Sequence, residues 1–184
     1  MKDLNMIFAG FGGQGVLFAG KVTAYAGLIA KKEISWLPSY GPEMRGGTAN
    51  CSVCISDEPI GSPLVTNPNV LVAMNLPSLD KFIDTVEPGG TVLIDSTLIA
   101  KKVERTDVNV YYVPASELAE ENGVKGLANI ILVGKLFHEV CMAQGQYLFC
   151  DGEVLDQAIQ KCIPARKAEM LDFNRKAVEI GAKQ

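Results

Sequence analysis

The architecture follows from a run near the N-terminus, Leu4-Asn-Met-Ile-Phe-Ala-Gly10-Phe-Gly-Gly-Gln-Gly15. Its first six residues form a short apolar run that ends at a glycine, which predicts a buried strand. The four glycines then predict a loop, and the apolar residues from Gly13 to about Ala30 predict a helix. A buried strand, a glycine loop and a helix in this order are typical of the first unit of a parallel α/β sheet.

Short apolar segments alternate with helical patterns along the rest of the chain. We predict further strands at 33–37, 48–56, 70–74, 91–95 and 108–113, and further helices at 77–86, 114–121, 127–142, 151–162 and 165–180. This alternation indicates a three-layer α/β/α fold with a mainly parallel, Rossmann-like sheet. No repeat or linker interrupts the pattern, so we expect residues 1–184 to form one domain.

Composition and charge exclude several classes of protein. The net charge is −4 and no basic cluster is present, which argues against a nucleic-acid groove. The first residues lack a signal-peptide layout. Residues 11–30 have the length of a membrane span, but their glycines leave a helix of only about 15 residues, which is short for crossing a bilayer. We therefore expect a cytoplasmic protein with no nucleic-acid or membrane partner.

The cysteines do not indicate disulfides or a metal site. There are five of them, an odd number in a chain without an export signal. Cys51 and Cys54 lie three apart on a predicted strand, so their side chains point to opposite faces. The only histidine is His138, which we expect to be packed without a partner carboxylate. Buried thiols are the better interpretation, and we predict no metal ligand.

The glycine loop is the first candidate site, because Gly10 to Gly15 satisfies G-x-G-x-x-G between a strand and a helix. Glycines allow the backbone to approach a ligand, and a helix N-terminus offers free N–H groups and the positive end of a dipole to an anion. A nicotinamide dinucleotide would also need an acid at the end of the second strand. That strand has Glu33 at its start and apolar Leu37 near its end. The loop therefore indicates a phosphorylated ligand other than NAD, or a tight turn that serves packing alone.

A second loop, Ser39-Tyr-Gly-Pro-Glu-Met-Arg-Gly-Gly-Thr48, is long and rich in glycine. Loops on a rigid sheet commonly carry function. The alternative is a surface loop with a local contact between Glu43 and Arg45. Two weaker candidates are Asp95-Ser-Thr97, at the end of a strand, as a ligand contact or a cap, and Asn129, for which the alternative is a bond to backbone.

Together, Gly10–Gly15, the Ser39–Thr48 loop, Asn75-Leu-Pro-Ser78 and Pro88-Gly-Gly90 resemble the gamma subunit of 2-oxoacid:ferredoxin oxidoreductases. The resemblance covers nearly the whole chain in the same order, and the Tyr-Gly-Pro-Glu-x-Arg-Gly-Gly string is its most specific part. The 2-oxoglutarate branch is the most similar. The pyruvate, branched-chain and indolepyruvate branches share much of the pattern.

This resemblance implies a reaction that the chain performs only within a complex. The complex decarboxylates a 2-oxoacid on thiamine diphosphate with Mg²⁺, passes electrons through iron–sulfur clusters to ferredoxin, and transfers the acyl group to coenzyme A. The cofactors belong to partner subunits of alpha, beta and ferredoxin-like delta type. The isolated chain is then expected to be inactive, to bind no cofactor, to hold no catalytic residue of its own, and to pair with a copy of itself.

The resemblance also implies roles for individual residues. The matching domain III of single-chain pyruvate:ferredoxin oxidoreductases has a similar glycine loop, followed by a lysine, and is implicated in holding coenzyme A. Lys21 matches that lysine, although it can also be a charge at a solvated helix edge; Gln14 and Gly20 depart from the Asp and Asn of those enzymes. The expected coenzyme A contacts are Gly10, Gly12, Gly13, Gln14, Gly15 and Lys21. The expected active-site or interface loop comprises Tyr40, Glu43, Arg45, Gly46, Gly47 and Thr48.

Two other functions remain open at this stage. A free-standing NAD- or flavin-binding oxidoreductase would share the glycine loop, but the missing acid of the second strand argues against it. A structural scaffold subunit would use both loops only to pack on its partners.

Overall fold

The computed structural model describes residues 3–40, 48–143 and 149–184 of the chain. Within these residues six strands form one sheet, in the order β2-β3-β1-β4-β5-β6. Neighbouring pairs β1/β4, β4/β5 and β5/β6 are parallel, whereas β3 runs antiparallel to both β1 and β2. The predicted mainly parallel sheet is therefore confirmed. The strands are β1 (Leu4–Phe11), β2 (Glu33–Tyr40), β3 (Thr48–Ser56), β4 (Val70–Ala73), β5 (Thr91–Asp95) and β6 (Asn109–Val113).

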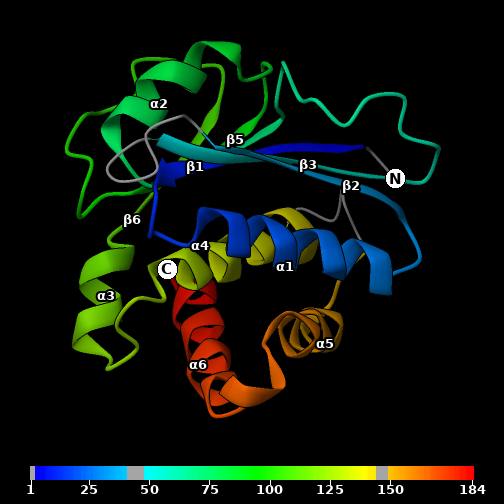
Figure 1. Cartoon of the computed structure of the whole chain (residues 1–184). Coiled ribbons are helices and arrows are strands. Elements are labelled where there is room, and N and C mark those ends of the chain that lie inside the picture. Colours follow the sequence, from blue (N-terminus) through cyan, green and yellow to red (C-terminus); the bar gives the residue numbers. More distant parts are fainter. Residues whose placement is uncertain (1–2, 41–47, 144–148) are drawn as a thin grey trace.

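Helices cover both faces of this sheet, as Figure 1 shows. One face carries α1, α4, α5 and α6, and the opposite face carries α2, while α3 packs beside α4 and α6. The predicted three-layer arrangement is confirmed. The helices are α1 (Val16–Ile29), α2 (Leu76–Phe82), α3 (Ala115–Glu121), α4 (Ala128–Phe137), α5 (Gly152–Cys162) and α6 (Met170–Ala182), with 3₁₀ turns at Ile83–Thr85 and Ala165–Lys167 and a π-helical turn at His138–Ala143.

The position of β1 inside the sheet explains why its sequence is mostly apolar. Met6 and Phe8 pack into the core beneath the α1 and α4 face, whereas Ile7 and Ala9 pack beneath α2. Alternate residues of a strand point to opposite faces, so a strand covered on both sides is apolar at successive buried positions. The two cysteines of β3 obey the same rule. Cys51 lies in the core on the α1 and α4 side of the sheet, and Cys54 lies in the core on the α2 side. This confirms the prediction that their side chains point to opposite faces.

The cysteines are buried thiols that form no disulfide among the described residues, as the sequence predicts. Burial raises the pKa of Cys51 to about 12, although a hydrogen bond with Trp36 acts against the rise. In the part of the chain that the structure describes, no three His, Cys, Asp or Glu side chains cluster as metal ligands. Across the same ranges no helix combines the length and apolar character that crossing a bilayer requires.

Helices α4 and α6 approach closely because a glycine lies on each side of their contact. A β-carbon added at Gly134 would collide with the backbone of Val178, and one added at Gly181 would collide with the carbonyl of Ile131. Neither helix leaves room for a side chain at these two points. α6 therefore packs tightly against α4, which lies against the sheet and carries part of the candidate site at its N-terminal end.

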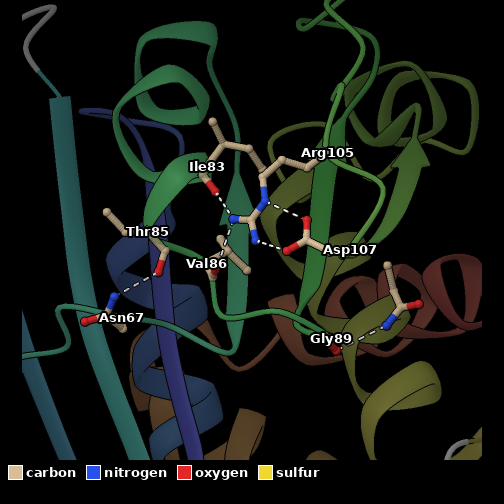
Figure 2. Close-up of polar contacts among 8 residues, drawn as sticks. Asn67, Ile83, Thr85, Val86, Gly89, Arg105 and Asp107 are labelled. Carbon is tan, nitrogen blue, oxygen red and sulfur yellow. Dashed lines mark hydrogen bonds and ion pairs between the residues drawn. The ribbon is translucent and has the colours of Figure 1, made fainter.

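The edge of the sheet where β5 and β6 begin is held by one arginine, drawn in Figure 2. Arg105 Nη1 donates to the carbonyls of Ile83 and Val86, both at 2.8 Å. Its Nε and Nη2 donate to the carboxylate of Asp107 at 2.9 and 2.6 Å. These hydrogen bonds hold the pKa of Asp107 below its usual value. Arg105 thus stabilises the fold, at the ends of the strands opposite the glycine loop.

Several predicted boundaries were wrong, among them the helix predicted at 77–86, whose α-helical part ends at Phe82. β2 continues through Pro38 to Tyr40, because an edge strand pairs on one side only and tolerates a missing N–H. The helix predicted at 127–142 leaves α-geometry after Phe137. The helix predicted at 165–180 begins only at Met170.

Candidate functional site

The candidate site lies where two neighbouring parallel strands send their chains to opposite faces. β1 continues into α1 on one face, and β4 continues into α2 on the other (Figure 1). In open α/β sheets, ligands bind in the crevice beyond the carboxyl ends of such strands. Gly10 to Gly15 lies at the end of β1, and Met74 and Asn75 lie at the end of β4. The fold therefore puts the glycine loop at the expected ligand crevice.

The glycine loop has a backbone that only glycine adopts easily. Gly13 has a φ of 95° and Gly15 a φ of 75°, both in the left-handed region. Gly15 is the N-cap residue of α1, and no side chain caps this helix. The first N–H groups of α1 have no partner within the helix, so they remain donors at the positive end of its dipole. The loop can therefore bind an anion.

Gln14, which we predict as a ligand contact, also makes hydrogen bonds within the protein. Its Oε1 accepts from the N–H of Phe11 at 2.6 Å, and its Nε2 donates to the carbonyl of Met74 at 2.9 Å. Both ends of the amide are thus engaged inside the protein. Gln14 ties the glycine loop to the end of β4 and so fixes the shape of the crevice.

A cavity of about 250 Å³ opens beside this loop. Segments distant in the sequence meet there: the loop after β1, the end of β4, helix α3 and the start of α4. Three polar side chains of its wall were not predicted from the sequence: Ser116, Glu120 and Lys125. Lys125 Nζ lies 3.4 Å from the exposed carboxylate of Glu120. The only local signal was a lysine between Gly123 and Gly126, just ahead of a predicted helix. The cavity is lined by Gly13, Gln14, Met74, Ser116, Ala119, Glu120, Lys125, Gly126 and Ala128.

Lys21 does not line this cavity. It lies six residues after Gly15, or about 9 Å further along the axis of α1 at 1.5 Å per residue. Its ammonium group is 5.7 Å from the centroid of the Tyr25 ring. It also lies near Cys162 of α5, where its charge opposes the rise that burial gives to the pKa of that thiol, about 11. Lys21 therefore lies along α1 near α5, outside the cavity that Lys125 borders.

The second loop of the sequence begins and ends next to the first. The backbone of Tyr40, at the end of β2, pairs with Ala49. Thr48, at the start of β3, pairs with Phe11, which belongs to the glycine loop. Glu43, Arg45, Gly46 and Gly47 lie outside the described residues. The framework thus brings together the two segments that the sequence singles out.

Two of the minor candidates have partners of their own. Asp95 is fully buried, and its carboxylate accepts from the hydroxyl of Ser116 at 2.6 Å and from the N–H of Thr97 at 3.2 Å, as a cap does. His138 has a carboxylate partner, contrary to expectation, since its Nδ1 lies 3.3 Å from Glu139.

Glu139 in turn bonds to the buried ammonium of Lys135 at 2.6 Å. Burial alone would raise the pKa of Glu139, but hydrogen bonds from Lys135 and Tyr111 outweigh it and keep the pKa below its usual value. This polar group supports the junction of α4 with the sheet.

Comparisons with known proteins identify the family. Residues 5–184 match the pyruvate ferredoxin/flavodoxin oxidoreductase family, and the chain belongs to it. The ketoisovalerate oxidoreductase subunit VorA of Methanothermobacter thermautotrophicus is 43% identical over 180 residues, which cover 98% of this chain and 36% of VorA. The 2-oxoglutarate synthase subunit KorC of Methanocaldococcus jannaschii is 41% identical over 138 residues, 73% of each chain. The resemblance stated from the motifs is confirmed, and the chain spans about a third of the length of VorA.

Two solved structures share the whole fold. The keto/oxoacid ferredoxin oxidoreductase gamma subunit from Geobacter sulfurreducens superposes with a TM-score of 0.82 at 27% identity, covering 100% of this chain and 96% of that one. The 2-oxoglutarate:ferredoxin oxidoreductase from Magnetococcus marinus, with 2-oxoglutarate, coenzyme A and succinyl-CoA bound, superposes with a TM-score of 0.84 at 25% identity. This chain matches 31% of that longer chain and is itself covered completely.

Proposed function

We propose that this chain is the gamma-type subunit of a 2-oxoacid:ferredoxin oxidoreductase. The complex would convert a 2-oxoacid, coenzyme A and oxidised ferredoxin into acyl-CoA, CO₂ and reduced ferredoxin. The family match and the full superposition on a gamma subunit support this role. We propose 2-oxoglutarate as the 2-oxoacid. A branched-chain 2-oxoacid is the second candidate, because the relative that is 43% identical over nearly the whole chain is a ketoisovalerate oxidoreductase subunit.

Within that complex we assign this chain the binding of coenzyme A through its phosphates. The observation that carries the assignment is the uncapped N-terminus of α1, which lies behind a left-handed glycine loop at the crevice between β1 and β4. A β-carbon added at Gly13 would meet no atom within 4 Å, so open space adjoins the loop. Coenzyme A is the phosphorylated substrate of this reaction, and the related Magnetococcus marinus structure holds it.

Both the glycine loop and the two lysines would contact the phosphates of coenzyme A. Backbone N–H groups of the loop and of the first turn of α1 would contact one phosphate group. Coenzyme A has a diphosphate and a separate 3′-phosphate, so two separate cations suit it chemically. Lys125 borders the cavity, and Lys21 lies about 9 Å along α1 from the glycine loop. Binding would draw Lys125 away from its exposed pair with Glu120, a contact that costs little to break.

Partner subunits would supply the remaining chemistry. Thiamine diphosphate, Mg²⁺ and the iron–sulfur clusters are proposed to reside in alpha, beta and ferredoxin-like delta subunits, with ferredoxin as the electron acceptor in the cytoplasm. The residues from Tyr40 to Thr48 are proposed to form the interface loop. Support comes from Thr48, whose backbone pairs with Phe11 of the glycine loop, and from Tyr40, which pairs with Ala49 one strand further out, so a partner docked there would also face coenzyme A.

Lys125→Ala and Lys21→Ala test the coenzyme A assignment in the assembled complex. Losing a charged phosphate contact costs about 1.5–3 kcal/mol, so each substitution should raise the KM for coenzyme A roughly 10- to 150-fold. The KM for the 2-oxoacid should not change. Steady-state kinetics with each substrate varied in turn give both constants.

Lys102→Ala is the matched control, because Lys102 packs over the ring of Tyr112, away from the cavity. An effect of Lys125→Ala alone would remove Lys21 from the site. If both lysine variants left the coenzyme A constant unchanged and altered the 2-oxoacid constant, the wrong substrate would have been assigned to this loop.

A further inference from the structure

One buried polar side chain of α4 reaches across to the glycine loop. Asn129 is 3% exposed, and the residues around it on α4 are apolar. Its Nδ2 donates to the carbonyl oxygen of Gly15 at 3.0 Å, although the two residues are 114 positions apart in the sequence. The expectation that this asparagine bonds to backbone is confirmed. The backbone in question belongs to the candidate site and not to its own helix.

The carbonyl that accepts from Asn129 also accepts the first backbone hydrogen bond of α1. The N–H of Ala19 also donates to the oxygen of Gly15, at 3.0 Å, in the first hydrogen bond of the helix. Asn129 therefore acts on the residue that sets the direction of the N–H groups in the first turn. Its neighbour Ala128 lines the cavity together with Gly13, so the hydrogen bond lies directly behind the cavity wall.

Gly15 and Asn129 also fit one another sterically. A β-carbon added at Gly15 would lie 2.5 Å from Asn129 Nδ2, too close for any real contact. Glycine is thus required at position 15 for two reasons: its φ of 75°, and the approach of this amide. Burying the Asn129 side chain also costs free energy of folding, because its Oδ1 is buried without a hydrogen-bond partner among the described residues. A side chain that costs free energy in a core is expected where it serves a function.

We propose that Asn129 is a positioning residue of the anion site. By holding the carbonyl of Gly15, it keeps the loop in its left-handed turn and aims the free N–H groups of α1 into the cavity. It does not touch the ligand, since its side chain is buried. The inference rests on the proposed binding of coenzyme A phosphates at this loop.

The chain offers a matched control in Asn174 of α6. Asn174 is 2% exposed, its Nδ2 donates to the carbonyl of Met170 at 2.8 Å, and its Oδ1 is likewise buried without a partner. The two asparagines thus have the same burial and the same pattern of bonds. They differ in that Asn174 bonds within its own helix, far from the loop in sequence.

The test compares Asn129→Ala with Asn174→Ala in the assembled complex. Both should lower the melting temperature by similar amounts. Only Asn129→Ala should raise the KM for coenzyme A, roughly tenfold for one lost positioning hydrogen bond, with kcat and the 2-oxoacid KM within about twofold of wild type. Asn129→Asp cannot donate to the carbonyl and adds a negative charge near the anion, so it should bind coenzyme A more weakly still. If Asn129→Ala does not assemble, Asn129→Ser serves in its place.

A wild-type coenzyme A constant in these Asn129 variants overturns the proposal. An equal rise in Asn174→Ala overturns it as well, because the effect would then follow from lost stability. Gly13→Val, measured in parallel, distinguishes failure of the positioning role of Asn129 from failure of the binding site itself. If Gly13→Val weakens coenzyme A binding and Asn129→Ala does not, the positioning role fails and the binding site stands; if neither weakens it, the binding site itself fails.

Discussion

Gly13→Val is expected to raise the KM for coenzyme A in the assembled complex by more than either lysine substitution, by at least about 150-fold. Gly13 has a φ of 95° and borders the cavity, and open space surrounds the point where a β-carbon would lie. A branched side chain there would occupy the space that a phosphate needs, and it would strain the backbone of the loop. Steady-state kinetics and calorimetric titration of coenzyme A into the complex measure the loss.

Gly123→Val separates ligand exclusion from backbone strain. Gly123 has a φ of 70° and equally open surroundings, but it does not line the cavity. It should cost a similar amount of stability, about 1–2 kcal/mol for a left-handed residue with a side chain, and leave the KM for coenzyme A unchanged. Equal effects of the two variants on KM would mean that the glycine loop serves the fold alone.

Gly181→Val is expected to cause the largest loss of stability. The added side chain would collide with the carbonyl of Ile131, which belongs to the backbone of α4 and cannot rotate away. Overpacking against backbone should cost at least about 3 kcal/mol, which corresponds to a melting temperature lower by roughly 6–12 °C in a chain of this size. Thermal unfolding of the purified chain, followed by circular dichroism, gives the shift.

Gly152→Ala is the control for that measurement. Gly152 begins α5, its φ is not positive, and an added β-carbon would meet nothing within 4 Å. Alanine should therefore be neutral or stabilise by up to about 1 kcal/mol. A Gly181→Val variant that melts with the wild type would show that α4 and α6 are not packed as described.

The sequence predicted those parts of the fold whose signals are local. The bounds of β3 and β5 agree with the predicted strands. Thr48–Ser56 contains β-branched residues and Thr91–Asp95 is mostly apolar, and glycine- or proline-rich sequence precedes each of them. The glycine loop was placed correctly between a strand and a helix, since its glycines and the flanking apolar runs are adjacent in the chain.

The parts that sequence reasoning missed depend on neighbours distant in the chain. Helical periodicity puts the apolar residues Phe173, Ala177 and Ile180 on one face of α6, yet Phe173 is 45% exposed, whereas the polar Asn174 is buried. The rotation of α6 is set by the close approach of Gly181 to α4, which no periodicity reveals.

The candidate site also contains residues that could not be predicted from the sequence, because they depend on distant neighbours. Lys125 belongs to the cavity only because α3 and α4 fold back against the loop after β1, and Asn129 bonds to Gly15 across 114 residues. A sequence motif can indicate the loop itself, but it cannot indicate which distant side chains support the loop.

Native purification of this chain from its own cells, followed by a substrate-dependent reduction assay, tests the central claim most directly. The chain should co-purify with subunits that carry thiamine diphosphate and iron–sulfur clusters. The preparation should reduce a viologen dye and form acyl-CoA only when a 2-oxoacid and coenzyme A are both present, and the isolated chain should do neither. A chain that purifies without such partners, or a complex whose turnover does not depend on coenzyme A, would contradict the account.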